Sequence, residues 1–285
     1  MDILSFQSTP FLENAAYLFT YVGLFFFSKF LKDKFSSYDL DQQLTHYDNV
    51  AVSVSAAGYF LAITIIFLGA AAGTTSATGE FATEWMLDVL YSIAGILLLQ
   101  LSRWINAKAI LYKFSVDKEI VKDQNPGTGV VEGAVYVASA LVIGGSMSGE
   151  GAWWSALVFY ALGQVCLIAF AWLYVKLSPY SVHDEIERDN TAAGLGFAGG
   201  LISIGIILNR AVSGDFVDWS TDLTEFGLDV LIVFVFLAVT RLVFDKLILR
   251  KSDLHTEIAN DQNLGAGLLE MVVSISFSCV LYAML

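Results

Sequence analysis

Charged residues, prolines and cysteines are all scarce in this sequence. Only 15% of its 285 residues are charged, and it contains three prolines and two cysteines. Such a composition lies outside the range of soluble globular domains. Both cysteines, Cys166 and Cys279, lie in apolar runs, which favours small packing residues over a disulfide or a metal site.

Positive charge is scarcer than negative charge. The 15 Lys and Arg residues stand against 28 Asp and Glu, which gives a net charge of -13 and argues against nucleic acid as a partner. The sequence also lacks a nucleophile beside a base, a phosphate-binding loop and the GxGD or GxSG motifs of intramembrane proteases. Residues 194–199 spell GxGxxG but follow no strand, so they do not indicate a dinucleotide site. We therefore predict no enzyme activity, no cofactor and no metal.

Long hydrophobic runs make up most of the chain. Hydrophobic residues account for 56% of it, and its mean hydropathy is +0.65. Crossing a hydrocarbon core of about 30 Å takes roughly 20 residues of helix. Eight runs reach this length: 11–30, 50–72, 84–105, 127–148, 152–175, 191–211, 223–244 and 264–285. The sequence thus predicts an all-α, polytopic integral membrane protein with eight transmembrane helices in contact with the lipid bilayer.

Lysine and arginine lie almost entirely on one side of the predicted membrane. All of them except Arg210 are at the ends of odd-numbered helices or in the linkers that follow. The positive-inside rule places these linkers in the cytoplasm and both termini outside. The outer side is acidic, with residues such as Glu84, Asp215 and Asp222, so we expect cations to accumulate there.

The second half of the chain repeats the first. Residues 83–90, Thr-Glu-Trp-Met-Leu-Asp-Val-Leu, return as Thr-Glu-Phe-Gly-Leu-Asp-Val-Leu at 224–231. Because each unit has an even number of crossings, the two four-helix units, 1–149 and 150–285, are predicted to be parallel rather than inverted repeats. The even-numbered helices are rich in Gly, Ala and Ser, which permits close packing. We place them centrally, in an arrangement that permits a ring, with the odd-numbered helices toward lipid.

The four even-numbered helices begin alike. Each start carries an Asp and an Asn: Asp48 and Asn49, Asp123 and Asn125, Asp189 and Asn190, Asp261 and Asn263. These residue types favour helix N-caps. The functional alternative is a ring of Asp and Asn pairs that binds cations at a cytoplasmic mouth.

The linkers before these starts share a second pattern. Each has one apolar residue among polar ones, which predicts a short interfacial helix packed against the bundle: Leu44, Ile120, Ile186 and Ile258. The three histidines, His46, His183 and His255, also lie in the linkers. No HxxxH or CxxC spacing accompanies them, so we expect solvated polar residues rather than a metal site or a pH sensor.

Two glutamates lie inside the predicted membrane. Glu132 and Glu270 each follow a helix-start Asn by seven positions, about 10 Å inside the boundary at 1.5 Å per residue. A carboxylate at such a depth costs on the order of 2.5–3.5 kcal/mol and is usually paired, protonated or turned to a polar cavity. We assign them, with Asp88 and Asp229 nearer the outer boundary, to a candidate ion or proton site; hydrogen-bonded packing residues are the alternative. An axis along the membrane normal would make Glu132 and Glu270 face each other in the interior.

The duplicated four-helix unit, with its Asp-Asn helix starts followed by Ala- and Gly-rich sequence, resembles the YjfL-like family of bacterial membrane proteins, domain of unknown function 350. The likeness covers nearly the whole chain. It implies a multi-pass protein of the bacterial inner membrane, encoded near genes of polyamine metabolism and membrane stress, and it brings no catalytic residues. The chain departs from four-fold symmetry, because Ala56 and Phe197 stand where the other two helices have Glu132 and Glu270.

Two functions follow as hypotheses. The first is a transporter or channel for a cation, proton or polyamine that uses the membrane-embedded carboxylates. The alternative is a non-transporting scaffold whose linkers recruit a cytoplasmic peripheral membrane protein related to membrane stress or polyamines. The Gly and Ala faces offer more helix contact than one eight-helix bundle requires, so we also predict a homodimer.

Overall fold

The computed structural model describes residues 11–74, 81–149, 151–243 and 253–285, and every regular element within these ranges is a helix. The eight predicted runs are the long helices α1 (Phe11–Phe35), α3 (Val50–Thr74), α4 (Phe81–Ala109), α6 (Pro126–Met147), α7 (Trp153–Leu177), α9 (Thr191–Val212), α10 (Trp219–Val243) and α11 (Leu264–Met284). The four linkers contain the short helices α2 (Leu40–Thr45), α5 (Val116–Val121) and α8 (Val182–Glu187), and the π-helical turn η3 (Thr256–Asn260).

Length and hydropathy support the membrane assignment. Within the described residues, seven helices are long and apolar enough to cross a bilayer: α1, α3, α4, α6, α7, α9 and α11. The eighth run is a helix of 25 residues, α10. The all-α, polytopic fold is confirmed.

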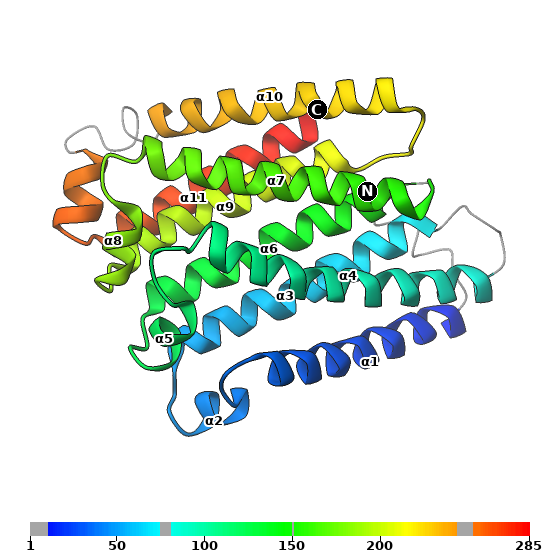
Figure 1. Ribbon diagram of the computed structural model, residues 1–285, viewed down its shortest axis with the longest axis horizontal. Coiled ribbons are helices and arrows are strands. Elements are labelled where there is room, and N and C mark those ends of the chain that lie inside the picture. The colour runs from blue at the N-terminus through cyan, green and yellow to red at the C-terminus, as the bar shows by residue number, and fades with distance from the viewer. Residues whose placement is uncertain (1–10, 75–80, 150, 244–252) are drawn as a thin grey trace.

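Four of the long helices, α3, α6, α9 and α11, form a row in that order (Figure 1). The row depends on glycine at its three interfaces. A Cβ on Gly58, Gly205 or Gly199 would lie only 2.4 to 2.7 Å from a Cα atom of the neighbouring helix. Because no side chain separates them, these backbones approach closely enough for extensive van der Waals contact, which holds helices together in membranes.

This row corrects the expected arrangement of the even-numbered helices. α6 and α9 are central, and 78% of the membrane-spanning stretch of each is buried, whereas only 22% of that of α11 is buried. α3 and α11 lie at opposite ends of the row, so the four helices of one chain do not close into a ring (Figure 1). The inner helices α6 and α9 contact a neighbour of the row on each of two sides, whereas α3 and α11 each contact only one, so the row has two ends.

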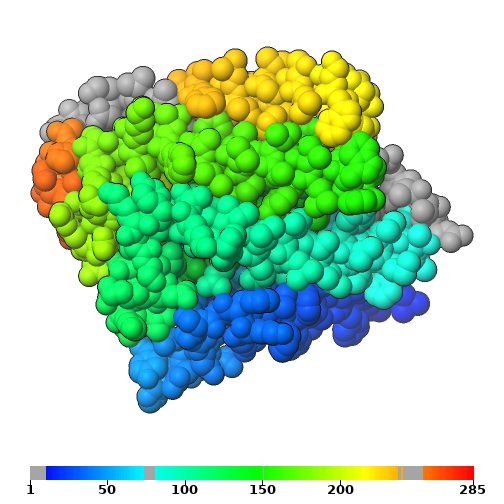
Figure 2. Space-filling model, in the orientation of Figure 1, coloured from blue at the N-terminus to red at the C-terminus, as the bar shows by residue number. Residues whose placement is uncertain are grey.

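The odd-numbered long helices cover one side of the row. α4 packs over α3 and α6, α7 over α6 and α9, and α10 over α9, while α1 packs against α3. Figure 2 shows these four helices as successive bands of blue, blue-green, green and yellow across the visible face. Their bulky side chains are therefore placed around the small-residue helices.

Each helix of the row is capped by an asparagine. The side-chain oxygen accepts a hydrogen bond from the amide three residues later, at 3.1 to 3.2 Å, in the pairs Asn49 with Val52, Asn125 with Thr128, Asn190 with Ala193, and Asn263 with Ala266. The residue before each asparagine has a positive φ of 47 to 63°: Asp48, Gln124, Asp189 and Gln262. A left-handed turn thus sets the direction in which each asparagine enters its helix.

Three of these asparagines also bind the next linker along the row. The side-chain amide donates to the main-chain carbonyl of the apolar linker residue, at 2.6 to 2.8 Å, in the pairs Asn49 with Ile120, Asn125 with Ile186, and Asn190 with Ile258. The three isoleucine side chains are fully buried. The linker helices are therefore packed into the bundle at the same end of the molecule, which we call the linker end.

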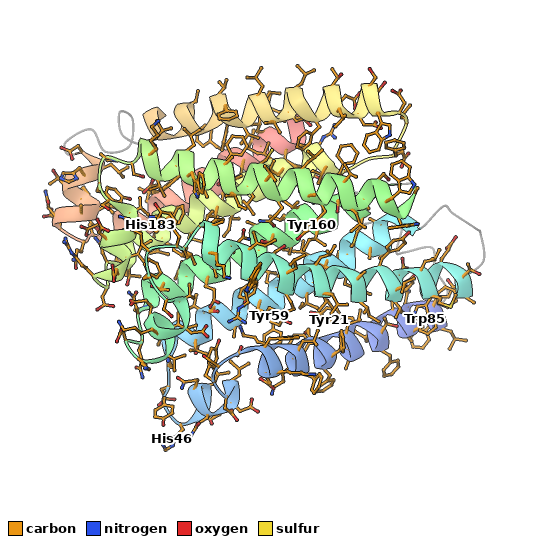
Figure 3. All side chains as sticks on the ribbon, in the orientation of Figure 1. Tyr21, His46, Tyr59, Trp85, Tyr160 and His183 are labelled. Carbon is orange, nitrogen blue, oxygen red and sulfur yellow. The ribbon has the colours of Figure 1, made fainter. Side chains whose placement is uncertain are left out.

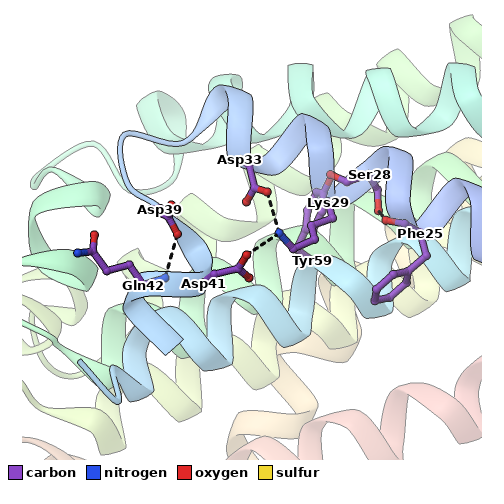
Figure 4. A network of polar contacts seen from close by, with 8 residues as sticks. All are labelled: Phe25, Ser28, Lys29, Asp33, Asp39, Asp41, Gln42 and Tyr59. Atoms are coloured by element: carbon purple, nitrogen blue, oxygen red, sulfur yellow. Dashed lines mark hydrogen bonds and ion pairs between the residues drawn. The ribbon is translucent and has the colours of Figure 1, made fainter. Parts of the chain in front are cut away.

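The first linker helix is also attached to α1 by charge. Lys29 Nζ lies 2.9 Å from a carboxylate oxygen of Asp33 and 3.2 Å from one of Asp41 in α2 (Figure 4). Ion pairs this close to solvent stabilise a protein little. Their effect here is to fix the position of α2 beside α1.

We predict that Gly58→Ala lowers the free energy of unfolding by about 1–3 kcal/mol, because its Cβ would overlap the backbone of α6, which cannot move aside. Unfolding in mixed micelles with increasing dodecyl sulfate measures the change. The matched control is Gly23→Ala in α1, where no atom lies within 4 Å of the new Cβ. An equal loss for both variants would contradict the role of glycine in the row.

Candidate functional site

Glu132 of α6 is held by two neighbouring helices. Ser55 Oγ of α3 donates a short hydrogen bond to Glu132 Oε2. Arg103 Nε of α4 lies 3.6 Å from Glu132 Oε1, and the glutamate side chain is only 6% exposed. The contact of Gly58 with Gly133 brings α3 close enough for Ser55 to reach the carboxylate.

Arg103 connects this carboxylate to the linker end. Its Nη2 lies 3.3 Å from Asp117 of α5, and its Nη1 donates to the Phe35 carbonyl at the end of α1, at 3.2 Å. The guanidinium thus joins α1, α4, α5 and α6. The opposite charge of the guanidinium offsets part of the cost of burying a carboxylate inside the membrane.

Lys32 of α1 is a second buried cation in this cluster. Its side chain is 2% exposed, and its Nζ lies 5.0 Å from the ring centroids of Tyr59 and of Tyr136. Within the described part of the chain, Nζ has no hydrogen-bond acceptor, although the charge of Glu132 acts on it. Burial first, and then the Glu132 charge, raise the pKa of the nearby Tyr38 in the turn after α1 above its usual value.

Tyr59, whose ring lies beside Lys32, is hydrogen-bonded to two neighbouring helices. Gln100 Nε2 of α4 donates to the Tyr59 hydroxyl at 2.9 Å. That hydroxyl donates to the Ser28 carbonyl of α1 at 2.8 Å. Tyr59 therefore links α3 to both of its odd-numbered neighbours.

Two further pairs lie beyond Tyr59, toward the end of the molecule opposite the linkers. Tyr21 of α1 and Thr64 of α3 share a hydrogen bond of 2.8 Å between their hydroxyls. Tyr17 donates to Asp88 Oδ2 of α4 at 2.8 Å, and Asp88 is fully buried. Figure 3 shows Tyr59 and then Tyr21 along the first half, with Trp85 beyond them.

We call this set the polar seam; its members are Tyr17, Tyr21, Ser28, Lys32, Ser55, Tyr59, Thr64, Asp88, Gln100, Arg103 and Glu132. Its four residues on α1 lie on one helix face, because they are spaced at i, i+4, i+11 and i+15. Fifteen residues of helix cover about 22 Å at 1.5 Å per residue. The polar seam therefore extends over most of the thickness of a hydrocarbon core.

The second half holds Glu270 differently. Tyr174 of α7 donates to Glu270 Oε1 at 3.0 Å. Gly196, which is 141 residues after Ser55, faces the other oxygen, and a Cβ there would lie 2.4 Å from Oε2. A tyrosine and a glycine thus stand beside Glu270, where a lysine and a serine stand beside Glu132.

The prediction that Glu132 and Glu270 face each other across a central axis is wrong. α9 lies between α6 and α11 in the row, and the hydrogen bonds described for the two glutamates join each one to a residue of its own half. The physical reason is that the parallel repeats stack side by side. A stacked repeat places equivalent residues on the same side of successive helices, not opposite one another.

Asp88 and Asp229 do not lie beside the glutamates, although Asp88 belongs to the same polar seam as Glu132. They lie in the parts of α4 and α10 away from the linker end. Asp229 is half-buried and lines an open cavity of about 540 Å³ together with Asp222, Glu225 and Arg210. Asp215 is a fourth carboxylate in the lining, and four carboxylates with one guanidinium give this cavity a negative character that attracts cations.

The aspartates at the four helix starts do not cap these helices, since the cap in each case is the asparagine. Asp48 and Asp189 form the left-handed turn before it. Asp123 lies one residue earlier and pairs with Lys118 at 2.9 Å, while Asp261 is exposed. The asparagine side chains are used within the row and its linkers, so the helix starts do not form a ring of Asp and Asn pairs.

The histidines differ from one another. His46 and His255 are exposed, as expected, but His183 of α8 is buried, and its Nε2 donates to the Ile110 carbonyl at 2.7 Å. The expectation of a solvated residue is wrong there, because α8 packs its inner side against the bundle. Burial, assisted by the Lys113 charge, lowers the pKa of His183, and the bond to Ile110 opposes this shift. In the described ranges, no three or more His, Cys, Asp or Glu side chains gather as metal ligands.

The family profile described as Domain of Unknown Function (DUF350) matches residues 5–147 and again residues 150–285. The chain belongs to this family. Over 271 residues it is 25% identical to the UPF0719 transmembrane protein of Aquifex aeolicus (strain VF5), an alignment that covers 91% of this chain and 95% of that protein. No solved structure matches the chain. The resemblance to this family is confirmed, and so is a multi-pass membrane protein.

Several polar residues of this DUF350 protein were not singled out from its sequence. By sequence alone, Lys32 cannot be distinguished from the interfacial lysines beside it. The polar face of α1, by contrast, could have been found from the helical spacing of its polar residues. A second buried cluster joins the two halves: Asn106 donates to Ser139 at 2.9 Å and accepts from Gln164 at 2.6 Å. Polar residues scattered singly through apolar runs carry no signal until the helices are packed.

We predict that Arg103→Gln costs about 3–5 kcal/mol of stability, because it leaves Glu132 buried without its guanidinium partner. The double variant Arg103→Gln with Glu132→Gln should lose less than Arg103→Gln alone. Unfolding in mixed micelles completes this double-mutant cycle. Strictly additive losses would show that the two side chains are not coupled.

We predict a pH-dependent stability from His183. Because burial lowers its pKa, the folded state resists protonation, so stability is complete above about pH 6.5 and falls as the pH drops below this value toward the folded pKa. Thermal denaturation at pH 7.5 and 5.5 should show a smaller decrease for His183→Gln than for the original chain. The exposed control, His255→Gln, should keep the original pH dependence; equal profiles for all three would contradict the assignment.

Proposed function

We propose that this protein conducts or transports protons across its membrane along the polar seam of its first half. The observation that carries the proposal is the cluster of Lys32, Arg103 and Glu132, together with the separate hydrogen-bonded pairs that follow it along the same helices as far as Asp88. Ionisable residues inside transmembrane helices are costly and typically mark ion pathways or proton relays. This cluster contains two cations and one carboxylate within the membrane-spanning helices.

The chemistry of the polar seam suits a proton. Its members carry carboxylates, hydroxyls, an amide, an ammonium and a guanidinium group, and aromatic rings pack against them. A proton moves between such groups through short hydrogen bonds and intervening water, whereas a hydrated metal ion or a polyamine needs an open channel. The substrate class proposed here is therefore the proton rather than a larger cation.

Each end of the polar seam has a separate role in this proposal. Glu132 exchanges the proton at the linker end, where Ser55 and Arg103 hold its carboxylate in place. Asp88 exchanges it at the opposite end, where Tyr17 donates to its carboxylate. The negative cavity near Asp229 raises the local concentration of cations on that side.

The proposed membrane is the bacterial cytoplasmic membrane, with the linker end inside and both termini outside. The excess of Lys and Arg at the linker end supports this orientation. A scaffold that recruits a partner through its linker isoleucines has less support, because the side chains of Ile120, Ile186 and Ile258 are fully buried.

We predict that Glu132→Gln and Asp88→Asn each lower proton flux at least about tenfold, since each removes a group that binds and releases the proton. Purified protein in liposomes with a pH-sensitive dye inside, driven by a potassium diffusion potential, provides the measurement. Both substitutions keep the volume of the side chain, so membrane insertion should be normal.

Two other variants serve as comparisons. The exposed linker residue Glu187, changed to Gln, should leave the flux unchanged. Glu270→Gln should retain most of it, because Gly196 and Tyr174 replace the serine and lysine of the first half. Absence of flux in the original chain, or full flux in a correctly inserted Glu132→Gln, would reject the proposal.

A further inference from the structure

We infer that copies of this chain assemble head to tail, with α11 of one copy packed against α3 of the next, so that the row of helices continues from chain to chain. The inference concerns the two ends of the row and does not depend on proton transport. It rests on one type of helix interface that occurs three times within the row. Each end of the row carries only one of the two sides of this interface.

The first repeated element is a backbone contact near the linker end. Residues in each helix of the row can be counted from its cap asparagine. The fourth residue after the asparagine of one helix contacts the second residue after the asparagine of the preceding helix. The pairs are Gly129 with Ala51, Gly194 with Gly127, and Gly267 with Ala192, in which a Cβ on the first residue would lie 2.3 to 2.7 Å from the carbonyl oxygen of the second. The register is thus identical at all three interfaces.

The second repeated element is the asparagine bond to the next linker. The side-chain amides of Asn49, Asn125 and Asn190 each donate to the carbonyl of the apolar residue in the following linker, and all three asparagines are fully buried. Each also donates to the side chain of the Gln or Glu six or five residues earlier in its own linker. An internal cap asparagine therefore uses both hydrogens of its side-chain amide.

The α11 end carries the donor half of a fourth interface. Asn263 donates to Glu257 in its own linker at 2.7 Å, as the other three do, but it is exposed and makes no bond to a further linker in the described part of the chain. Gly265 occupies the position of Ala51, Gly127 and Ala192. Only the Asn263 side chain lies within 4 Å of a Cβ placed on it.

The α3 end carries the matching acceptor half. Leu44 is the apolar residue of the first linker, and its carbonyl accepts no hydrogen bond from the described residues outside its own helix. Ser53 and Ala57 of α3 stand where Gly129 and Gly133 of α6 contact the preceding helix, and both are at least partly exposed. A second copy of α11 would find a small-residue face and a free linker carbonyl. Because Ser53 carries a Cβ where the internal interfaces have glycine, this α11 would lie slightly farther from α3 than neighbouring helices of the row lie from each other.

Lipid alone does not complete these ends. Exposed leucine and valine on α11 are satisfied by lipid chains, so their exposure is no argument for a protein partner. A main-chain carbonyl and a side-chain amide at the membrane boundary can bind water, but each end of the row also offers the polar group that the other end lacks. Such an interface is heterologous, and it closes into a ring if the rotation from copy to copy closes.

Cysteine crosslinking tests the head-to-tail contact. Two differently tagged full-length chains, both with Cys166→Ala and Cys279→Ala, carry Ser53→Cys in one and Gly265→Cys in the other. Coexpressed in membranes and oxidised, they should form a crosslinked product that contains both tags. The matched control replaces Gly265→Cys with Leu177→Cys, an exposed position at the linker end of α7.

The outcomes separate the possibilities. A product with both tags in the first pair, well above that in the control pair, supports the inference. A product equal to the control, or Gly265→Cys chains that crosslink to one another as efficiently as to Ser53→Cys chains, overturns it. The latter result would indicate a symmetric dimer instead.

A second variant tests the asparagine without a new cysteine. Asn263→Ser keeps a good helix cap but removes the amide that would reach Leu44 of the next copy. Native mass spectrometry in nanodiscs should show oligomers for the original chain and a shift of at least about fivefold toward monomer for this variant, with helix content unchanged. Monomers alone in the original chain, or an unchanged distribution in the variant, would overturn the inference.

Discussion

The rest of this structure depends on one pair of hydrogen bonds, which the cap asparagine of a row helix makes with its side chain. Its oxygen caps one helix, and its nitrogen binds the carbonyl of the next linker, so that one residue positions two consecutive units. Polar backbone groups at a membrane boundary must find partners, and the cap asparagine supplies two of them at once. Because the bond recurs at Asn49, Asn125 and Asn190, each helix of the row is held at the same height relative to its neighbour.

The glycine contacts follow from that register. With the helix starts aligned, Gly58 lies against Gly133, and Gly129 lies against Ala51. Close backbones let a short side chain such as Ser55 reach Glu132 across the interface. The polar seam is therefore a consequence of the same packing that holds the row together.

The two halves share a fold, but the contacts described for their two buried glutamates differ. The first half surrounds its glutamate with Lys32, Ser55 and Arg103, whereas the described part of the second half offers Tyr174 and Gly196 to Glu270. Duplication has thus preserved the helix starts and linkers, which build the row, while the positions beside the glutamate differ. Stacked parallel repeats also create two unequal ends, which a closed or inverted arrangement would not have.

The sequence by itself determined the elements of this protein. Hydropathy, the Asp-Asn helix starts and the 141-residue repeat were enough for eight helices, two parallel halves and membrane location, because each of these depends on residues that are near one another in the chain. The positions of Glu132 and Glu270 within the first half of their helices also followed from counting residues along the chain.

Only the tertiary structure decided which residues meet. Ser55 and Glu132 are 77 residues apart, and Tyr17 and Asp88 are 71 apart, so no local pattern predicts their contacts. Periodicity could not distinguish a row from a ring, because both use parallel repeats with small-residue faces on two sides. The choice depends on the angle between successive helices, which arises from side-chain packing at each interface and separates Glu132 from Glu270.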